Sequence, residues 1–98
     1  MSAYIIAQIE ITDPDRYAEY VKQVPATIAR FGGRYLARGG KSEALEGRLT
    51  GRRIAIVEFD SYERAKDWYE SEDYRGPRAL RQGASISSLV LVEGVPAR

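Results

Sequence analysis

Apolar and polar residues alternate along residues 3–11, Ala-Tyr-Ile-Ile-Ala-Gln-Ile-Glu-Ile, and this alternation predicts a β-strand with one wholly apolar face. Shorter runs of the same kind predict strands over residues 34–38, 53–59 and 89–93. The glycine-containing polar segment 41–52 then predicts a hairpin arm, with a short extra strand near residues 43–45.

Between residues 14 and 31 the apolar positions recur every three or four residues, which predicts a helix with one buried stripe. Asp13 fits the N-cap and Pro14 the first helical position, and the pair Gly32-Gly33 ends the helix. Because Pro25 lacks an amide hydrogen, we expect a kink or a restart there.

A second helix is predicted to begin at Tyr62, after a cap at Asp60 or Ser61. A further short helical segment is expected within residues 71–83, restarting at Pro77.

The resulting order, β-α-β-β-α-β, is that of the ferredoxin-like α+β fold, and we expect residues 1–98 to form one domain. The predicted sheet has four strands of the antiparallel type in the order 4-1-3-2, with its first and third strands parallel at the centre. Helices should cover one face of this sheet, which carries Ile5, Ile9, Val57, Phe59 and Val90. The opposite face should carry Ile6, Leu36, Ile56, Leu89 and Leu91, which is too apolar to stay in water. A second copy of the chain is the expected partner.

The sequence contains no cysteine and no histidine, so thiolate chemistry and the commonest general base and metal ligand are excluded. We therefore expect no haem, no transition metal and no other tightly bound cofactor. A net charge of +1 gives no field for nucleic acid, and no apolar run is long enough to span a membrane. No secretory signal is visible, so a cytoplasmic location is expected.

A family resemblance rests on motifs spread along the chain. They are Tyr4, Asp13-Pro14-Asp15, Tyr17, Tyr20, Pro25, Gly32-Gly33-Arg34-Tyr35-Leu36, Arg38-Gly39-Gly40, Glu46-Gly47, Glu58-Phe59, Trp68-Tyr69 and Val92-Glu93-Gly94. Over nearly its whole length the chain resembles the bacterial domain-of-unknown-function family 1330, in the dimeric α/β-barrel superfamily. The resemblance implies a homodimer in which two sheets close a barrel. The superfamily includes cofactor-independent monooxygenases, muconolactone isomerases and haem enzymes such as chlorite dismutases, whereas this family has no assigned reaction.

The first candidate site consists of Gln8, Arg34, Arg38 and Glu58, which parity places together on the uncovered face. Arginine can grip a carboxylate ligand with its two-pronged guanidinium, and a desolvated Glu58 could act as a base. The alternative is an internal ion pair that serves assembly only. As a site, Glu58 and Arg38 would be the catalytic residues, and Gln8 and Arg34 would bind the ligand.

Two further groups of residues were weighed in the same way. The aromatic residues Tyr17, Tyr35, Phe59, Trp68 and Tyr69 converge between helices and sheet, either as a pocket in which Tyr35 and Trp68 bind a ligand or as ordinary core. The arginines at 75, 78 and 81 are spaced by three and fit a phosphate site or, in the reading we favour, a solvated helix face.

Three classes of function remain open at this point. The first is a cofactor-independent small-molecule enzyme, of monooxygenase or isomerase type, with an aromatic or carboxylate-bearing substrate in a pocket of the barrel. The others are a small-ligand-binding module without turnover and a structural or interaction dimer.

Overall fold

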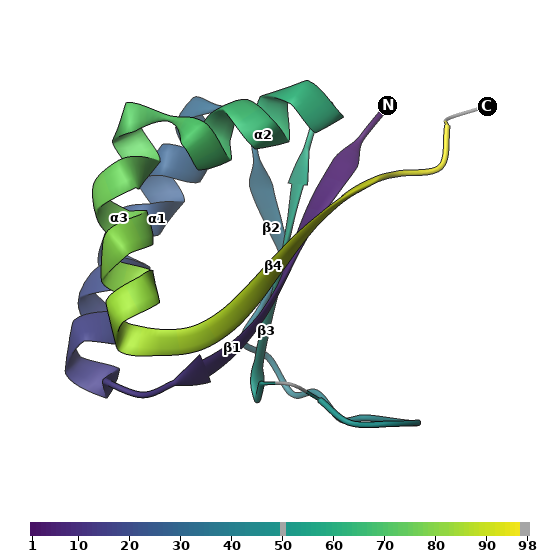
Figure 1. Cartoon of the computed structure of the whole chain (residues 1–98). Coiled ribbons are helices and arrows are strands. Elements are labelled where there is room, and N and C mark those ends of the chain that lie inside the picture. The colour runs from purple at the N-terminus through teal and green to yellow at the C-terminus, as the bar shows by residue number, and fades with distance from the viewer. Residues whose placement is uncertain (50, 97–98) are drawn as a thin grey trace.

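The computed structural model describes residues 1–49 and 51–96, in which three helices cover one face of a four-stranded sheet (Figure 1). The elements are β1 (Ala3–Ile11), α1 (Pro14–Arg30), β2 (Arg34–Arg38), β3 (Arg53–Phe59), α2 (Tyr62–Glu70), α3 (Glu72–Ala84) and β4 (Ser85–Glu93). The predicted ferredoxin-like α+β fold is thus confirmed. We call the sheet face under the helices the covered face and the opposite one the open face.

The sheet has the strand order β2-β3-β1-β4, as predicted, but every neighbouring pair is antiparallel. The expectation that β1 and β3 run parallel is therefore wrong. After β1 the chain runs back through α1, so β2 starts at the same end of the sheet as β1 and is parallel to it. The hairpin between β2 and β3 then makes β3 antiparallel to both strands. In the resulting register Tyr4 lies opposite Glu58, and Gln8 lies opposite Ile54.

Helix α1 begins where the sequence predicts and runs through Pro25 without a restart. At its start, the Asp13 side chain accepts a hydrogen bond from the backbone N–H of Arg16 at 3.2 Å. Pro25 cannot donate to the carbonyl of Val21 four residues earlier. The Arg38 guanidinium supplies a donor instead, with Nη2 3.2 Å from the Val21 oxygen. A side chain of β2 thereby replaces the hydrogen bond that α1 lacks at Pro25, where a kink or a restart was expected.

Helices α2 and α3 are separated by Ser71 alone. Its hydroxyl donates to the Trp68 carbonyl at 2.7 Å and accepts from the backbone N–H of Tyr74 at 3.2 Å, so one side chain ends α2 and caps α3. The predicted restart at Pro77 is wrong, because α3 begins at Glu72 and continues through Pro77.

The faces of β2 and β4 differ from those predicted by alternation. A bulge between Tyr35 and Ala37 brings Arg38 opposite Ala55, on the covered face. In β4, Leu91 lies opposite Ile5 on the covered face. The predicted positions of Val90, Leu89 and Leu91 are therefore reversed: both leucines face the helices and Val90 is 55% exposed on the open face. A run that is apolar at every position contains no alternation from which a face can be chosen.

The core is built around Trp68 of α2. Its ring centroid lies 4.0 Å from that of Tyr74 and 5.6 Å from that of Phe59, and all three side chains are fully buried. The indole N–H donates to the Thr27 hydroxyl at 3.0 Å, so its polar atom is satisfied. This cluster joins the three helices to β3.

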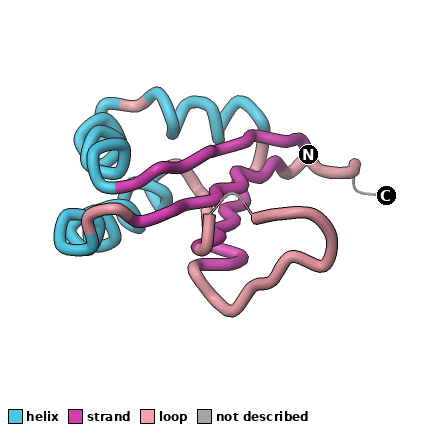
Figure 2. Tube along the Cα trace, turned by 60° about the horizontal axis from the view of Figure 1, so that its bottom comes forward, coloured by secondary structure: helices cyan, strands magenta, loops and turns pink. Residues whose placement is uncertain are grey.

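Between β2 and β3 the described residues 40–49 form a loop that extends away from the sheet (Figure 2). The extra strand predicted near residues 43–45 is not formed there.

Gly33, directly before β2, packs so closely against the core that no side chain fits. A Cβ there would lie 2.6 Å from the Phe59 ring and 2.8 Å from Ile28 Cγ2.

Gly33→Ala should therefore destabilise the protein by about 1–3 kcal/mol, since neither Phe59 nor Ile28 can move without repacking the core. Gly40→Ala is the matched control, because nothing lies within 4 Å of a Cβ at that position, and it should change the free energy of unfolding by less than about 0.5 kcal/mol. Urea denaturation of the two variants measures the difference. Equal stabilities would contradict the close packing at Gly33.

Candidate functional site

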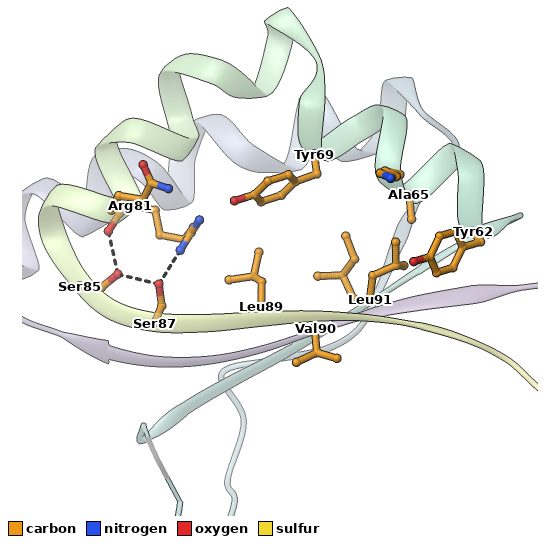
Figure 3. A pocket seen from close by; sticks show the side chains of 12 residues that line it. Tyr62, Ala65, Tyr69, Arg81, Ser85, Ser87, Leu89, Val90 and Leu91 are labelled. Carbon is orange, nitrogen blue, oxygen red and sulfur yellow. Dashed lines mark hydrogen bonds between the residues drawn. The ribbon is translucent and has the colours of Figure 1, made fainter.

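A cleft of about 500 Å³ lies between β4 and the helices α2 and α3 (Figure 3). Leu89 and Leu91 project into it from β4, and Tyr69 projects from α2 (Figure 3). Arg81 and Ser87 form its polar end. The exposed Lys66 of α2 also borders the cleft, which therefore combines apolar walls with a buried cation at one end and a solvated cation at its rim.

Arg81 of α3 is only 4% exposed, which is rare for a cation. Its Nε donates to the Tyr74 hydroxyl at 3.2 Å, and its Nη1 donates to the Ser87 hydroxyl (Figure 3). Among the described residues, no carboxylate forms an ion pair with it. A buried guanidinium that contacts only neutral groups retains most of its attraction for an anion.

The protonation states at this end of the cleft follow from burial and hydrogen bonding. Burial acts to lower the pKa of Arg81, but interactions with Tyr74 and Tyr20 outweigh it and hold that pKa above its ordinary value. Burial, reinforced by Tyr74, raises the pKa of Tyr20 far above its ordinary value. At neutral pH the site therefore holds a cation beside a neutral Tyr20.

The backbone around Arg81 is tied to the neighbouring elements. The Ser85 hydroxyl donates to the Arg81 carbonyl at 2.7 Å, while the hydroxyls of Tyr20 and Tyr74 lie 2.8 Å apart. The backbone N–H groups of Thr12 and Asp13 both donate to the carbonyl of Ala84. The guanidinium is thus fixed in position before any ligand arrives.

The structure brings together only part of the candidate site predicted from parity. Arg34 and Glu58 face each other across β2 and β3 and form the expected ion pair. Partial desolvation acts to raise the pKa of Glu58, but the Arg34 guanidinium outweighs it and holds this pKa below its usual range. A carboxyl with a lowered pKa is a weaker base than the one we expected.

The other two members of that candidate site lie elsewhere. Arg38 is on the covered face, because of the bulge in β2, and does not meet Glu58. Gln8 is on the open face between Ile54 and Ser88, since β1 and β3 are antiparallel. Glu58 and Arg38, predicted as catalytic residues, are therefore not brought together in one site.

The aromatic group divides between the core and two cavities. Phe59 and Trp68 pack in the core, and Tyr69 lines the cleft. Tyr35 lies on the covered face and, like Trp68, borders a smaller inner cavity. Tyr35 and Trp68 thus remain near a possible ligand, but not in the cleft.

Arg81 was missed by the sequence reading, which placed all three arginines of α3 on a solvated face. Arg75 is indeed exposed, and Arg78 donates to the Tyr69 carbonyl at 3.0 Å. Arg81 belongs instead to the buried stripe of α3, whose members are Tyr74, Pro77, Arg81 and Ala84. Their spacing of three, four and three residues was the signal that identifies Arg81 as buried.

No helix in the described ranges is long and apolar enough to cross a membrane. Residues 1–49 and 51–96 also contain no group of three or more histidine, cysteine, aspartate or glutamate residues that could hold a metal ion.

Comparison with known proteins identifies the family of the chain. A family model described as "Domain of unknown function (DUF1330)" matches residues 2–95, so the chain belongs to that family. Among curated proteins, none matches the sequence.

Several solved structures share the fold. The RPA0582 protein of unknown function from Rhodopseudomonas palustris has a TM-score of 0.76 at 17% identity, covering 98% of this chain and 84% of its own. SnoaB, a cofactor-independent oxygenase from Streptomyces nogalater, has a TM-score of 0.65 at 9% identity, with coverages of 98% and 95%. Rv0793 from Mycobacterium tuberculosis has a TM-score of 0.58 at 15% identity, with coverages of 99% and 98%. At these identities the likeness shows a common fold and leaves the reaction open.

The raised pKa of Tyr20 predicts a loss of stability in alkali. Above pH 10 the unfolded chain releases a proton that folded Tyr20 retains, so the free energy of unfolding falls as pH rises, by about 1.4 kcal/mol per pH unit for this group. Tyr20→Phe should reduce that slope by about this amount between pH 10 and 11.5, in urea titrations. Tyr62→Phe, at an exposed tyrosine, should keep the slope of the unmodified protein. Identical slopes for all three proteins would contradict the buried state of Tyr20.

Proposed function

We propose that the protein is a small-molecule enzyme without a tightly bound cofactor, and that its cleft holds an apolar, ring-sized substrate by an anionic oxygen. The observation that carries this proposal is Arg81, a buried cation without an acidic partner at the end of an apolar cleft. An anionic oxygen is the group that this guanidinium lacks.

The dimensions of the cleft support a substrate of this kind. Its volume of about 500 Å³ falls within the range of small-molecule pockets, and its walls include Tyr62, Tyr69, Leu89 and Leu91. An aromatic ring packed against Tyr69 would direct its oxygen substituent toward Arg81 (Figure 3).

The chemistry supported by this arrangement is stabilisation of charge on oxygen. A fixed guanidinium favours an enolate or phenolate over the neutral form, because it is already oriented toward the developing charge. The lining residues of the cleft include no carboxylate that could act as a base. A substrate that ionises readily, such as an enol or phenol, therefore fits better than one that needs a strong base.

Two reaction types can follow from such an anion without a cofactor: oxygenation by dioxygen, and isomerisation by return of the proton to another carbon. We place oxygenation first, and the likeness in fold to SnoaB, described as a cofactor-independent oxygenase, supports that order. The lack of a carboxylate in the cleft favours a second candidate, a module that binds the same anionic ligands without turnover.

Ser87→Asp tests the site without removing Arg81. The new carboxylate would pair with the guanidinium, so the fold should remain as stable or become more so while binding of anionic ligands is lost. Ser42→Asp is the matched control, because Ser42 is exposed in the loop between β2 and β3, outside the cleft and the open face, and its replacement adds the same charge.

The measurement is a thermal-shift screen of aromatic carboxylates, phenols and enols against their neutral amide or methyl ether analogues, followed by oxygen uptake with the compounds that bind. We expect charged ligands to stabilise the unmodified protein and Ser42→Asp but not Ser87→Asp. Binding without oxygen uptake or isomerised product would favour the non-catalytic module. Equal binding of neutral and charged analogues would refute the role of Arg81.

We also propose that the chain forms a homodimer through the open face. The dimer would exclude water from the face of the sheet opposite the cleft. Ile6, Leu36, Ile56 and Val90 lie on this face and are partly or largely exposed in the single chain. Apolar surface of this kind is typical of a protein interface.

Val90→Glu should dissociate the dimer and leave the monomer folded, because the Val90 side chain points away from the helices and is 55% exposed (Figure 3). Leu91→Glu, one residue further along β4, should instead lower the free energy of unfolding by about 3 kcal/mol or more, since Leu91 packs against the core. Light scattering and circular dichroism separate the two effects. A stable monomer of the unmodified protein at micromolar concentration would rule out this assembly.

A further inference from the structure

A second, smaller cavity of about 40 Å³ lies between α1 and the covered face of the sheet and shares Ile5, Arg81 and Leu89 with the cleft. Three arginines line it, Arg38, Arg53 and Arg81, together with the tyrosines Tyr17, Tyr20 and Tyr35. None of its lining residues is acidic. We call it the inner cavity.

Arg53 carries the clearest sign that something is missing from this cavity. Its Nε is buried, and within the described part of the chain it has no hydrogen-bond partner. Its guanidinium lies over the Tyr17 ring, with its Cζ 5.6 Å from the ring centroid. A buried donor without an acceptor costs free energy, and in native proteins such donors usually have an ion or water as partner.

The β2–β3 loop packs closely against this guanidinium at Gly39. Its φ is +71°, and a Cβ there would lie only 2.3 Å from Nη1 of Arg53. The backbone N–H of Gly39 donates to the Ile54 carbonyl at 2.8 Å, which keeps the loop in place. The guanidinium of Arg53 therefore packs against the backbone of Gly39 at one side of the inner cavity.

Arg38 forms the outer wall of the inner cavity. One of its nitrogens is held by the Val21 carbonyl, and its Cζ lies 4.7 Å from the centroid of the Tyr35 ring. The residue keeps a large exposed surface, which gives a small ion a route from solvent past its guanidinium.

No acidic residue lines the inner cavity in the described part of the chain to balance the positive charge of the three arginines. Among the described residues none of the three forms an ion pair. Burial raises the pKa of Tyr17, Tyr20 and Tyr35, so these hydroxyls stay neutral and can only donate or accept hydrogen bonds. Three cations around one desolvated space repel one another unless an anion separates them.

We propose that the inner cavity is a binding site for a small, singly charged anion of the size of a halide or formate. A volume of 40 Å³ accommodates about three water-sized particles, which is too little for an aromatic ring or a phosphate ester. The inner cavity shares Arg81 with the cleft, but Arg38 and Arg53 line the inner cavity and not the cleft, so variants at these two residues test this proposal separately from the proposed function.

Trp68 provides a direct readout of occupancy. It is the single tryptophan of the chain, it is 2% exposed, and it borders the inner cavity. Bromide quenches tryptophan by contact, so bromide bound in the inner cavity should quench its fluorescence along a saturating curve. Formate should reverse this quenching at constant ionic strength, with sodium gluconate as the bulky balancing salt. Weak, linear quenching that formate leaves unchanged would overturn the proposal.

Arg53→Met then locates the site, with Arg52→Met as the matched control. Arg52 is exposed, does not line the inner cavity, and its replacement removes the same charge. We expect Arg53→Met to weaken bromide binding at least tenfold and Arg52→Met to leave it within twofold. Equal weakening in both variants would mean a general charge effect and would sink the assignment. If Arg53→Met does not fold, Arg38→Met takes its place, and the titration of the unmodified protein already decides whether an anion binds.

Discussion

A chain of hydrogen bonds from Tyr20 through Tyr74 and Arg81 to Ser87 joins helix α1, helix α3 and strand β4. These hydrogen bonds stabilise the buried guanidinium of Arg81, which has no acidic partner among the described residues and is the most demanding feature of the fold. Each neutral partner satisfies one donor, and none cancels the charge. The cleft and the inner cavity both border Arg81, so the same buried cation shapes the two spaces in which a ligand could lie.

The charges of the protein are segregated by the sheet. On the open face Arg34 is paired with Glu58, whereas Arg38 and Arg53 on the covered face and Arg81 of α3 have no acidic partners among the described residues. A net charge of +1 conceals this arrangement, because the acidic residues that balance the total lie elsewhere. The affinity for anions that we propose is therefore a local property of the interior, not of the overall field.

Much of the fold could be predicted from the sequence, because it depends on local signals. Alternation in β1, the Asp13 cap and the Gly32-Gly33 end of α1 each act within a few residues. The faces of β2 and β4 could not be predicted in the same way. One bulge at Leu36 turns Arg38 to the covered face, and the fully apolar run in β4 fits either face equally well. The predicted pairing of Arg34 with Glu58 was correct because Arg34 precedes the bulge and β3 itself is regular.

The candidate site was harder to predict than the fold, for a physical reason. Buried cations violate the rule by which core positions are recognised, so Arg81 looked like a surface residue although its spacing matched the buried stripe of α3. Arg38 shows the complementary effect, since Pro25 removes a donor from α1 and the vacant Val21 carbonyl then attracts the guanidinium. A sequence can place such a group only if the acceptor it must satisfy is identified first. In the function that we propose, the cost of desolvating Arg81 is met during folding, so the anionic oxygen of a ligand would gain the full attraction of a guanidinium that is already dehydrated and fixed. The least favourable burial in the core would then supply the strongest interaction with the ligand.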